Sequence, residues 1–187
     1  MTELNELRIS DVRRDTSEAI VITFDVPKAL RKEFEYKHGQ YLTLSKVIDG
    51  KDIRRAYSIC SGSNREDGLL RVAIKLVKGG VFSTWAHRCL KAQDKIQALP
   101  PTGDFTNDLD PSGSRIYCCI AAGSGITPIL SIVKTILATE HQSRVVILYG
   151  NKRVSTIMFL EEINGLKNQY MERLQVHHVL TREPSFA

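Results

Sequence analysis

The spacing of apolar residues changes once along the chain, and this change divides the fold into two parts. In the first part, apolar and polar residues alternate, as along residues 20–26, which is the period of a half-buried strand. In the second part, short unbroken apolar runs such as residues 116–122 are typical of strands covered on both faces. Turn residues at 110–113 separate the two patterns. We therefore expect two domains, residues 1–110 and residues 111–187.

The first part is predicted to be a small antiparallel β-barrel. Alternation recurs along residues 70–76, and Asp49-Gly50 between two apolar stretches favours a hairpin. One helix is expected, over residues 83–90. Several short strands with turn signals between them are typical of a sheet that closes on itself.

The second part is predicted to be an α/β domain with a parallel sheet. Strands are expected at residues 116–122, 145–148 and 174–180, and apolar residues at helical spacing lie between them. This β-α-β-α-β order favours right-handed crossovers. Because doubly wound nucleotide-binding domains usually have five or more strands, we expect this domain to be truncated in the chain.

Composition excludes several classes of protein. The 26 Lys and Arg and the 21 Asp and Glu are interleaved, so the net charge of +5 forms no basic arm and nucleic acid is not an expected partner. No apolar run reaches the roughly 18 residues of a membrane span, and the first residues lack the pattern of a signal peptide. The four cysteines lack Cys-x-x-Cys spacing, so no metal site is expected. Cys118 and Cys119, inside an apolar run, are expected to be buried thiols of a cytoplasmic protein.

Arg55-Ala56-Tyr57-Ser58 ends a predicted strand and has the side chains that a flavin requires. A bound flavin nucleotide needs positive charge for its phosphates, a flat apolar wall for its ring, and donors toward the ring N5 and carbonyl edge. Along a strand, Arg55 and Tyr57 point to one face, and Ala56 and Ser58 to the other. By itself the tetrapeptide also fits an ordinary barrel strand with a surface arginine.

Gly79-Gly80 precedes the predicted helix of the first part. A glycine pair lets the backbone approach a ligand closely, and a helix start offers N–H groups to a pyrophosphate. We expect Ser83 to cap this helix and to add a hydroxyl. A turn followed by a capped helix, without any ligand, explains the same residues.

The motif Gly123-Ser-Gly-Ile-Thr-Pro128 lies between a predicted buried strand and a predicted helix. Its glycines permit a tight turn against a cofactor, and Pro128 suits the first position of a helix. The motif differs from Gly-x-Gly-x-x-Gly because proline stands in place of the third glycine. A strand-to-helix turn of any α/β domain has the same features.

Basic residues follow the other two predicted strands. Lys152 and Arg153 come after the second strand, and Arg182 comes after the third. Ligands bind at the carboxyl ends of the strands in open α/β sheets. NADP differs from NAD by a 2′-phosphate that needs cationic partners, so these residues favour NADP(H) over NAD(H). The alternative is that they are solvated loop charges.

Taken in order, the motifs resemble those of the ferredoxin–NADP reductase superfamily along essentially the whole chain. They are His38-Gly-Gln-Tyr41, Arg55-Ala-Tyr-Ser58, Val72-Ala-Ile-Lys75, Gly79-Gly-x-x-Ser83, Pro100-Pro-Thr-Gly-Asp-Phe105 and Ala122-Gly-Ser-Gly-Ile-Thr-Pro128. The resemblance implies an FAD-binding β-barrel followed by a domain that binds NADP(H) or NAD(H). It also implies an enzyme that passes a hydride from the nucleotide to the flavin, for which no catalytic histidine is required.

The resemblance further implies roles for individual residues. Arg55 would contact the FAD phosphates, Tyr57 would stack on the isoalloxazine ring, and Ser58 would hydrogen-bond near flavin N5. Tyr57 and Ser58 are thus the candidate catalytic residues. Further FAD contacts are implied for Ala56, Ala73, Ile74, Lys75, Val81, Phe82 and Ser83. Contacts with the nicotinamide nucleotide are implied for Gly123, Ser124, Gly125, Thr127, Pro128, Lys152, Arg153 and Arg182.

Within the superfamily, the motifs are similar to those of the reductase component of oxygenases that epoxidise phenylacetyl-CoA. This resemblance implies phenylacetate catabolism, a carboxy-terminal [2Fe–2S] domain, and electron transfer to a di-iron oxygenase component. No cysteine pattern for the cluster occurs here, so we expect it only in a segment missing from this chain. The alternatives are the reductase part of a flavohaemoglobin, another ferredoxin or flavodoxin reductase, and a non-catalytic flavin electron-relay subunit.

Overall fold

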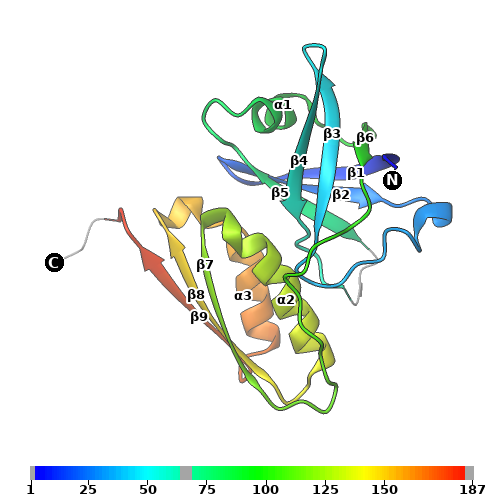
Figure 1. The fold of residues 1–187 in the computed structure, drawn as a ribbon. Coiled ribbons are helices and arrows are strands. Elements are labelled where there is room, and N and C mark those ends of the chain that lie inside the picture. Colours follow the sequence, from blue (N-terminus) through cyan, green and yellow to red (C-terminus); the bar gives the residue numbers. More distant parts are fainter. Residues whose placement is uncertain (1–2, 64–68, 184–187) are drawn as a thin grey trace.

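The computed structural model describes residues 3–63 and 69–183 of the protein (Figure 1). It has the predicted fold class, an antiparallel six-stranded sheet followed by a parallel three-stranded sheet with helices. Within the part of the chain that is described, no helix is both long and apolar enough to cross a bilayer.

The antiparallel sheet has the strand order β4-β3-β6-β1-β2-β5. A bridge between Ile59 and Val72 brings its two outer ends together, so that the sheet closes into a barrel. Helix α1 (Val81–Cys89) packs against the barrel and begins two residues earlier than predicted. The strands are β1 (Asn5–Thr16), β2 (Ala19–Asp25), β3 (Tyr41–Ile48), β4 (Lys51–Ser58), β5 (Leu70–Lys75) and β6 (Lys95–Ala98).

Asp49-Gly50 forms the predicted hairpin between β3 and β4. Both residues have a positive φ, of 49° and 75°, as in the type I′ turn that is favoured in two-residue hairpins. The hairpin sets a register in which Tyr57 of β4 pairs with Leu42 of β3. The end of β4 that carries the Arg-Ala-Tyr-Ser motif is thereby held beside β3, directly before the bridge that closes the barrel.

Strand β2 is buried on both faces, so the prediction of a half-buried strand is wrong. Ile20 and Ile22 enter the barrel core, as the alternation predicts. On the opposite face, Ala19 and Val21 pack together with side chains of the second half of the molecule. The face that the pattern assigns to solvent is therefore covered by a part of the chain more than 100 residues away, which a local pattern does not report.

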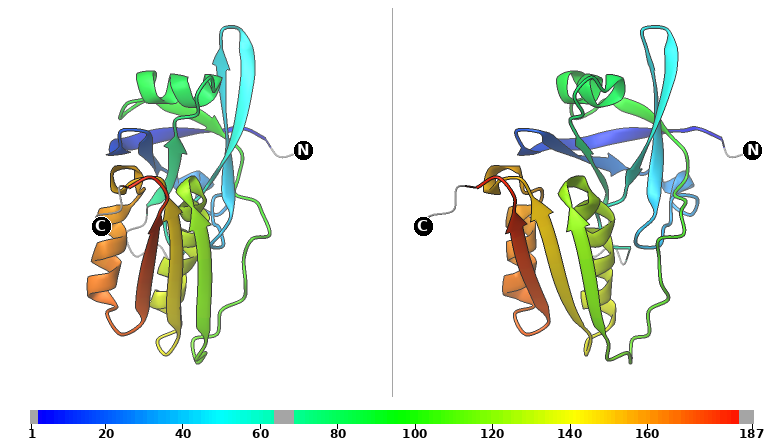
Figure 2. Two further views of the ribbon diagram at one scale, coloured as in Figure 1. Left: turned by 90° about the vertical axis from the view of Figure 1, so that its left-hand side faces the viewer. Right: turned by 60° about the vertical axis from the view of Figure 1, so that its left-hand side comes forward.

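The second half contains three parallel strands in the order β7-β8-β9. Helices α2 (Ile126–Thr139) and α3 (Leu160–Gln169) connect them and lie on the same face of the sheet (Figures 1 and 2). Right-handed crossovers that advance in one direction across a sheet put their helices on one face. The strands are β7 (Ile116–Ala122), β8 (Arg144–Asn151) and β9 (Leu174–Leu180).

The face of this sheet opposite the helices is exposed in the described structure. Ile116 and Ile120 of β7 are 77% and 71% exposed, and Leu148 of β8 is exposed beside them. The prediction that the apolar run of β7 is covered on both faces is therefore wrong. Cys118 lies on this face and is exposed, so its prediction as a buried thiol is also wrong, whereas Cys119 faces the helices and is buried.

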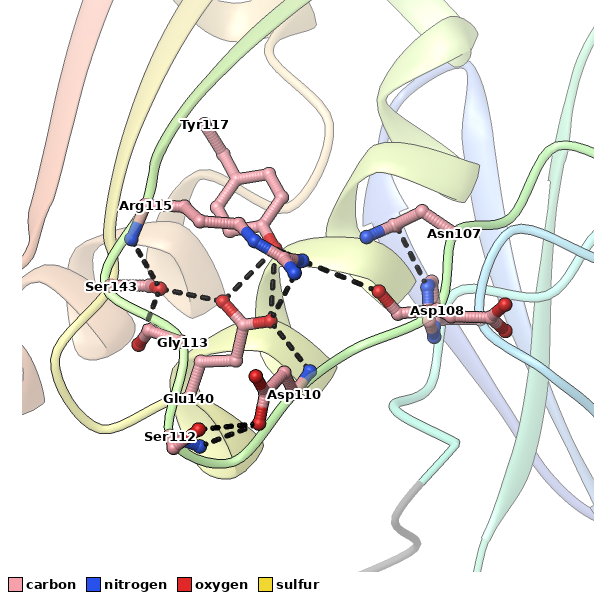
Figure 3. A network of polar contacts seen from close by, with 10 residues as sticks. Asn107, Asp108, Asp110, Ser112, Gly113, Arg115, Tyr117, Glu140 and Ser143 are labelled. Carbon is pink, nitrogen blue, oxygen red and sulfur yellow. Dashed lines mark hydrogen bonds and ion pairs between the residues drawn. The ribbon is translucent and has the colours of Figure 1, made fainter.

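A buried carboxylate fastens the segment between the two halves (Figure 3). Glu140, at the end of α2, has no exposed surface. It accepts hydrogen bonds from the amide of Asp110 at 3.0 Å and from the hydroxyl of Tyr117 at 2.9 Å. It also accepts one from the Ser143 hydroxyl at 2.5 Å, and Arg115 lies 3.3 Å away. Burial raises the pKa of Glu140, but these donors outweigh it and hold the pKa below its usual value, so the group is ionised at neutral pH.

Candidate cofactor site

The end of β4 lies next to the start of α1, so that two of the predicted flavin residues, Tyr57 and Phe82, are in contact. The rings of Tyr57 and Phe82 lie 5.6 Å apart between centroids, at a tilt of 39°. Tyr57 is half-buried, and burial raises the pKa of its phenol to about 12, against the charge of Arg55. The phenol therefore stays neutral at physiological pH. Arg55 is exposed and donates one hydrogen bond, to the carbonyl of Arg54 at 2.7 Å.

The last two residues of the motif have different surroundings. Ala56 is exposed. Ser58 pairs through its backbone with Tyr41 of β3 and is half-buried. Among the residues that the structure describes, none forms a hydrogen bond with the Ser58 hydroxyl, so this group is free to donate to a ligand.

The first turn of α1 offers backbone donors but is not capped by Ser83. Gly80 is the N-cap, and the first intrahelical bond runs from the amide of Thr84 to its carbonyl. The Ser83 hydroxyl accepts from the amide of Val77 at 3.1 Å and donates to the Gly80 carbonyl at 3.3 Å, so it closes the preceding turn. The prediction that Ser83 caps α1 is therefore wrong. The amides of residues 81–83 have no partner within the helix, which is the arrangement that binds phosphate groups.

Strand β5 contributes two side chains to the junction of the two halves, Ala73 and Lys75. Ile74 points into the barrel core and Ala73 into the cluster shared with the second half, so both side chains are buried. Lys75 instead reaches outward, with Nζ 3.8 Å from a carboxylate oxygen of Glu18. Its Nζ is also 3.7 Å from the point where a Cβ would stand on Gly123. The flavin motif of β5 and the predicted nucleotide turn are thus neighbours in space.

The predicted nucleotide turn is a 3-10 turn, Gly123–Gly125, between β7 and α2. Gly123 has a φ of 51°, which favours glycine. The carbonyl of Gly123 accepts from the Tyr149 hydroxyl at 3.0 Å, and the carbonyl of Ser124 accepts from the buried Thr127 hydroxyl at 2.9 Å. Thr127 therefore stabilises the turn from within. A Cβ on Gly125 would meet no atom within 4 Å, so the outer side of the turn is open.

Pro128 occupies the third residue of α2, since the helix begins at Ile126. The expectation that it stands first is wrong. The first turn of a helix has free amides throughout, so a proline at this position removes no hydrogen bond.

The carboxyl ends of β8 and β9 are joined by backbone hydrogen bonds. The amide of Arg182 donates to the carbonyl of Lys152 at 2.9 Å, which brings these two predicted cations together. Arg153 is exposed beside them. Glu183 also reaches this place and accepts from the amide of Val154 at 2.8 Å. The acid follows Arg182 directly in the sequence, but sequence reasoning assigned it no role.

Asn151 is a candidate site residue that sequence reasoning missed. It is 7% exposed at the carboxyl end of β8, and its Nδ2 has no hydrogen-bond partner among the described residues. Burial raises the pKa of Tyr149, two residues earlier in β8, to about 12. An unpartnered buried amide is costly unless a ligand satisfies it. The feature of the sequence that could have identified Asn151 is its position, because it lies at the end of a strand and directly precedes two cationic residues.

The chain matches two families of protein domain. They are the oxidoreductase FAD-binding domain, over residues 6–107, and the oxidoreductase NAD-binding domain, over residues 119–186. It is 36% identical to one component of the 1,2-phenylacetyl-CoA epoxidase of Escherichia coli K12, over 98% of this chain and 51% of that protein. It is 35% identical to the ferredoxin reductase component of the 3-ketosteroid-9-alpha-monooxygenase of Rhodococcus rhodochrous, over 93% of this chain and 48% of that protein. The chain thus spans about half the length of these relatives.

A solved structure supports the same fold. The ferredoxin–NADP+ reductase of Plasmodium falciparum, determined with 2'P-AMP, has a TM-score of 0.81 and 23% identity, over 98% of this chain and 76% of that chain. The two structures share an antiparallel barrel followed by a parallel α/β sheet.

Proposed function

The chain belongs to the ferredoxin–NADP reductase superfamily, and from this premise we propose that it is a flavin oxidoreductase. In this proposal the barrel holds FAD, the second half holds NADPH or NADH, and a hydride passes from nucleotide to flavin. The observation that carries the proposal is the approach of Lys75, from the flavin motif of β5, to Gly123 of the nucleotide turn. Two cofactors bound at these motifs would meet at that junction, as direct transfer requires.

The barrel residues fit FAD in the chemistry of their donors. Arg55 and the free amides at the start of α1 supply the positive charge and N–H groups that a pyrophosphate needs. The half-exposed ring of Tyr57 supplies an aromatic wall, and the buried ring of Phe82 supports it from the barrel core. FAD, when bound, accepts a hydride and releases electrons singly. Because burial raises the pKa of Tyr57 to about 12, this side chain would pack against the flavin rather than move a proton, and the free Ser58 hydroxyl would donate a hydrogen bond to the flavin near N5.

The second half fits a nicotinamide nucleotide. The turn at Gly125 is open to a phosphate, and the unpartnered Nδ2 of Asn151 offers a donor at the carboxyl end of β8. We assign recognition of a 2′-phosphate to Lys152 and Arg182, which favours NADPH over NADH. Glu183 opposes this preference by its charge, although its carboxylate is held by the amide of Val154.

We further propose that the electrons pass to the oxygenase component of a multicomponent system. Two relatives support this proposal, because one is named as part of a phenylacetyl-CoA epoxidase and the other as the reductase component of a monooxygenase. A [2Fe–2S] relay, where one is used, lies outside residues 1–187 in this proposal. The four cysteines of the chain do not have the spacing of cluster ligands.

Anaerobic reduction tests the proposed function. The protein is loaded with FAD, and the visible absorbance of the flavin is followed after NADPH or NADH is added without oxygen. We expect bleaching with either nucleotide and faster bleaching with NADPH. Free FAD with the same nucleotide is the control. A protein-bound flavin that stays yellow with both nucleotides would contradict the proposal and favour a non-catalytic relay subunit.

A further inference from the structure

Helix α2 connects the two predicted cofactor sites. It begins at Ile126, directly after the nucleotide turn, and side chains on all its faces are buried. A helix that is apolar on all sides is packed inside a protein rather than on its surface. Three of its polar side chains nevertheless point out of the second half, into the barrel. We name Ser131, Lys134 and Thr135 the α2 clasp.

The α2 clasp holds the segment that continues strand β4, residues 60–63. Ser131, which has no exposed surface, donates to the carbonyl of Ser61 at 2.7 Å. Thr135 accepts from the amide of Ser63 at 3.0 Å and donates to the carbonyl of Ser131 at 2.8 Å. The bonds to Ser61 and Ser63 therefore join α2 to a segment that starts two residues after Ser58, and the bond to the Ser131 carbonyl orients the Thr135 hydroxyl within α2.

Lys134 adds a charged contact to the same segment. Its ammonium group donates to the carbonyl of Cys60 at 3.2 Å and forms an ion pair with Glu162 of α3. The Lys134 side chain is 16% exposed and that of Glu162 is 28% exposed. Removal of either partner, the carboxylate or the carbonyl, would leave the partly buried ammonium group without a hydrogen bond that it needs, and this destabilises the folded state. Lys134 thus joins α2, α3 and the barrel at one point.

The barrel holds the segment from its other side. The Ser61 hydroxyl lies 2.7 Å from the Tyr36 hydroxyl and accepts from the amide of Arg71 at 3.1 Å. The Tyr36 hydroxyl is also 2.7 Å from the carbonyl of Gly62. The segment is therefore fixed within the barrel, and the α2 clasp transmits its position to the second half.

We propose that Ser131, Lys134 and Thr135 are positioning residues for the hydride transfer, because they lock the helix that starts at the nucleotide turn onto the segment that ends the flavin strand. This inference rests on the proposed function. The contacts begin about 8 Å from the first residue of α2, at about 1.5 Å of rise per residue. Over so short a length a helix is rigid, so the clasp sets the separation of Gly123 from Ser58. A misplacement of about 1 Å costs about 100-fold in rate in such reactions.

Thr135→Val is the most informative variant, because it keeps the shape of the side chain and removes its hydrogen bonds. We expect the rate of anaerobic FAD reduction by NADPH to fall at least about 10-fold. We expect the FAD content and the KM for NADPH to stay within about 2-fold, since neither set of ligands is touched. Amide hydrogen exchange at Ser63 should become faster, and this readout does not depend on activity.

Two further variants make the test specific. Thr135→Ser keeps the hydroxyl and should restore both the rate and the protection of the Ser63 amide. Thr139→Val is the matched control, since it makes the same change one turn later on α2 at a threonine without a side-chain hydrogen bond among the described residues. Thermal unfolding of each variant verifies folding, and Ser131→Ala replaces Thr135→Val if the latter does not fold.

The possible outcomes separate the two proposals. Slow reduction in Thr135→Val alone, with retained FAD and unchanged KM, supports the positioning role. Reduction of Thr135→Val at the rate of Thr139→Val overturns it and leaves the proposed function intact. A wild-type protein that neither NADPH nor NADH reduces overturns the proposed function and, with it, the positioning role.

Discussion

The two halves of the molecule differ in how completely they cover their own apolar surface. The barrel closes its sheet through Ile59 and Val72 and fills its interior with its own side chains. The sheet of the second half is covered by helices on one face, while Ile116 and Ile120 are exposed on the other. The barrel adds the side chains of Ala19, Val21, Cys60 and Ala73 to the core of the second half, but the outer face of the sheet stays exposed in the described structure.

The shared surface between the halves is apolar as well as polar. Ala19, Val21, Cys60 and Ala73 of the barrel belong to the same buried cluster as α2 and β7. Asp15 of β1 accepts from the amide of Phe159 at 2.9 Å, at the start of α3. Contacts of the chain itself thus set the relative position of the two halves. The predictions below test this difference, from the largest expected effect to the smallest.

Gly39→Ala is expected to have the largest effect, because Gly39 packs against the chain that leaves the barrel and lies next to Ile132 of α2. A Cβ on Gly39 would lie 1.8 Å from the carbonyl oxygen of Phe105, and Gly39 has a φ of 83°. We expect the free energy of unfolding in urea to fall by about 3 kcal/mol or more. The control is Gly50→Ala in the barrel hairpin, where φ is 75° but no atom lies within 4 Å. It should cost only about 1–2 kcal/mol, and equal losses in both variants would disprove the clash.

Glu140→Gln tests how the second half holds the connecting segment. The loss of charge weakens the bonds from Tyr117, Ser143 and Asp110, and we expect a loss of about 3 kcal/mol in the free energy of unfolding at pH 7. Because the folded-state pKa of Glu140 is lowered, its contribution is complete above the usual value of 4.5 and disappears as pH falls through the folded pKa. The wild type should therefore lose stability below about pH 4.5 more steeply than the variant. Parallel pH profiles would show that Glu140 is not the responsible group.

Arg55→Ala tests the barrel as the flavin-binding half. Removal of charge-assisted bonds to phosphate should weaken FAD retention by about 1.5–3 kcal/mol. FAD content after dialysis measures the effect. Arg31→Ala, an exposed arginine outside the predicted site, is the control. Full FAD content in Arg55→Ala would contradict the assignment.

Lys152→Ala combined with Arg182→Ala tests the second half as the nucleotide-binding half. We expect the KM for NADPH to rise by about 10-fold or more and the KM for NADH to change little, because only NADPH has the 2′-phosphate. Glu183→Gln should shift the ratio of the two KM values in the opposite direction. Equal changes for both nucleotides would refute recognition of the 2′-phosphate at this place.

Cysteine alkylation tests the exposed sheet face without any amino-acid substitution. Cys118 and Cys89 are exposed and should react quickly with iodoacetamide. Burial raises the pKa of Cys60 to about 12 and that of Cys119 to about 11, so both should resist until the protein unfolds. Mass spectrometry of peptides distinguishes the four sites. Protection of Cys118 in the native protein would mean that the exposed face is covered in solution.

Local patterns predicted the elements of the fold well. The hairpin at Asp49-Gly50 follows from turn chemistry, and the bounds of β7 follow from an unbroken apolar run. The strand faces whose burial was predicted wrongly depend on residues that are distant in the sequence. Val21 is buried by the second half, and Cys118 is exposed because both crossovers lie on one side of the sheet. No pattern within a few residues reports either fact.

Site residues were predictable where a sequence motif marks them. They were not predictable where residues far apart in the sequence come together only in the folded protein. The ring contact of Tyr57 with Phe82 agrees with two motifs read separately. Asn151 and the α2 clasp were missed, because a polar residue within an apolar helix or strand gives no sign of its partner. Ser83 was misassigned because a serine near a helix start serves equally as a cap or as part of the preceding turn.

The binding of FAD by the purified protein tests the central claim most directly. The visible spectrum and the FAD released on denaturation are measured before and after incubation with added FAD and removal of the excess. The account predicts a yellow protein with about one FAD per chain, either as purified or after incubation. A folded protein that remains colourless after incubation would contradict it.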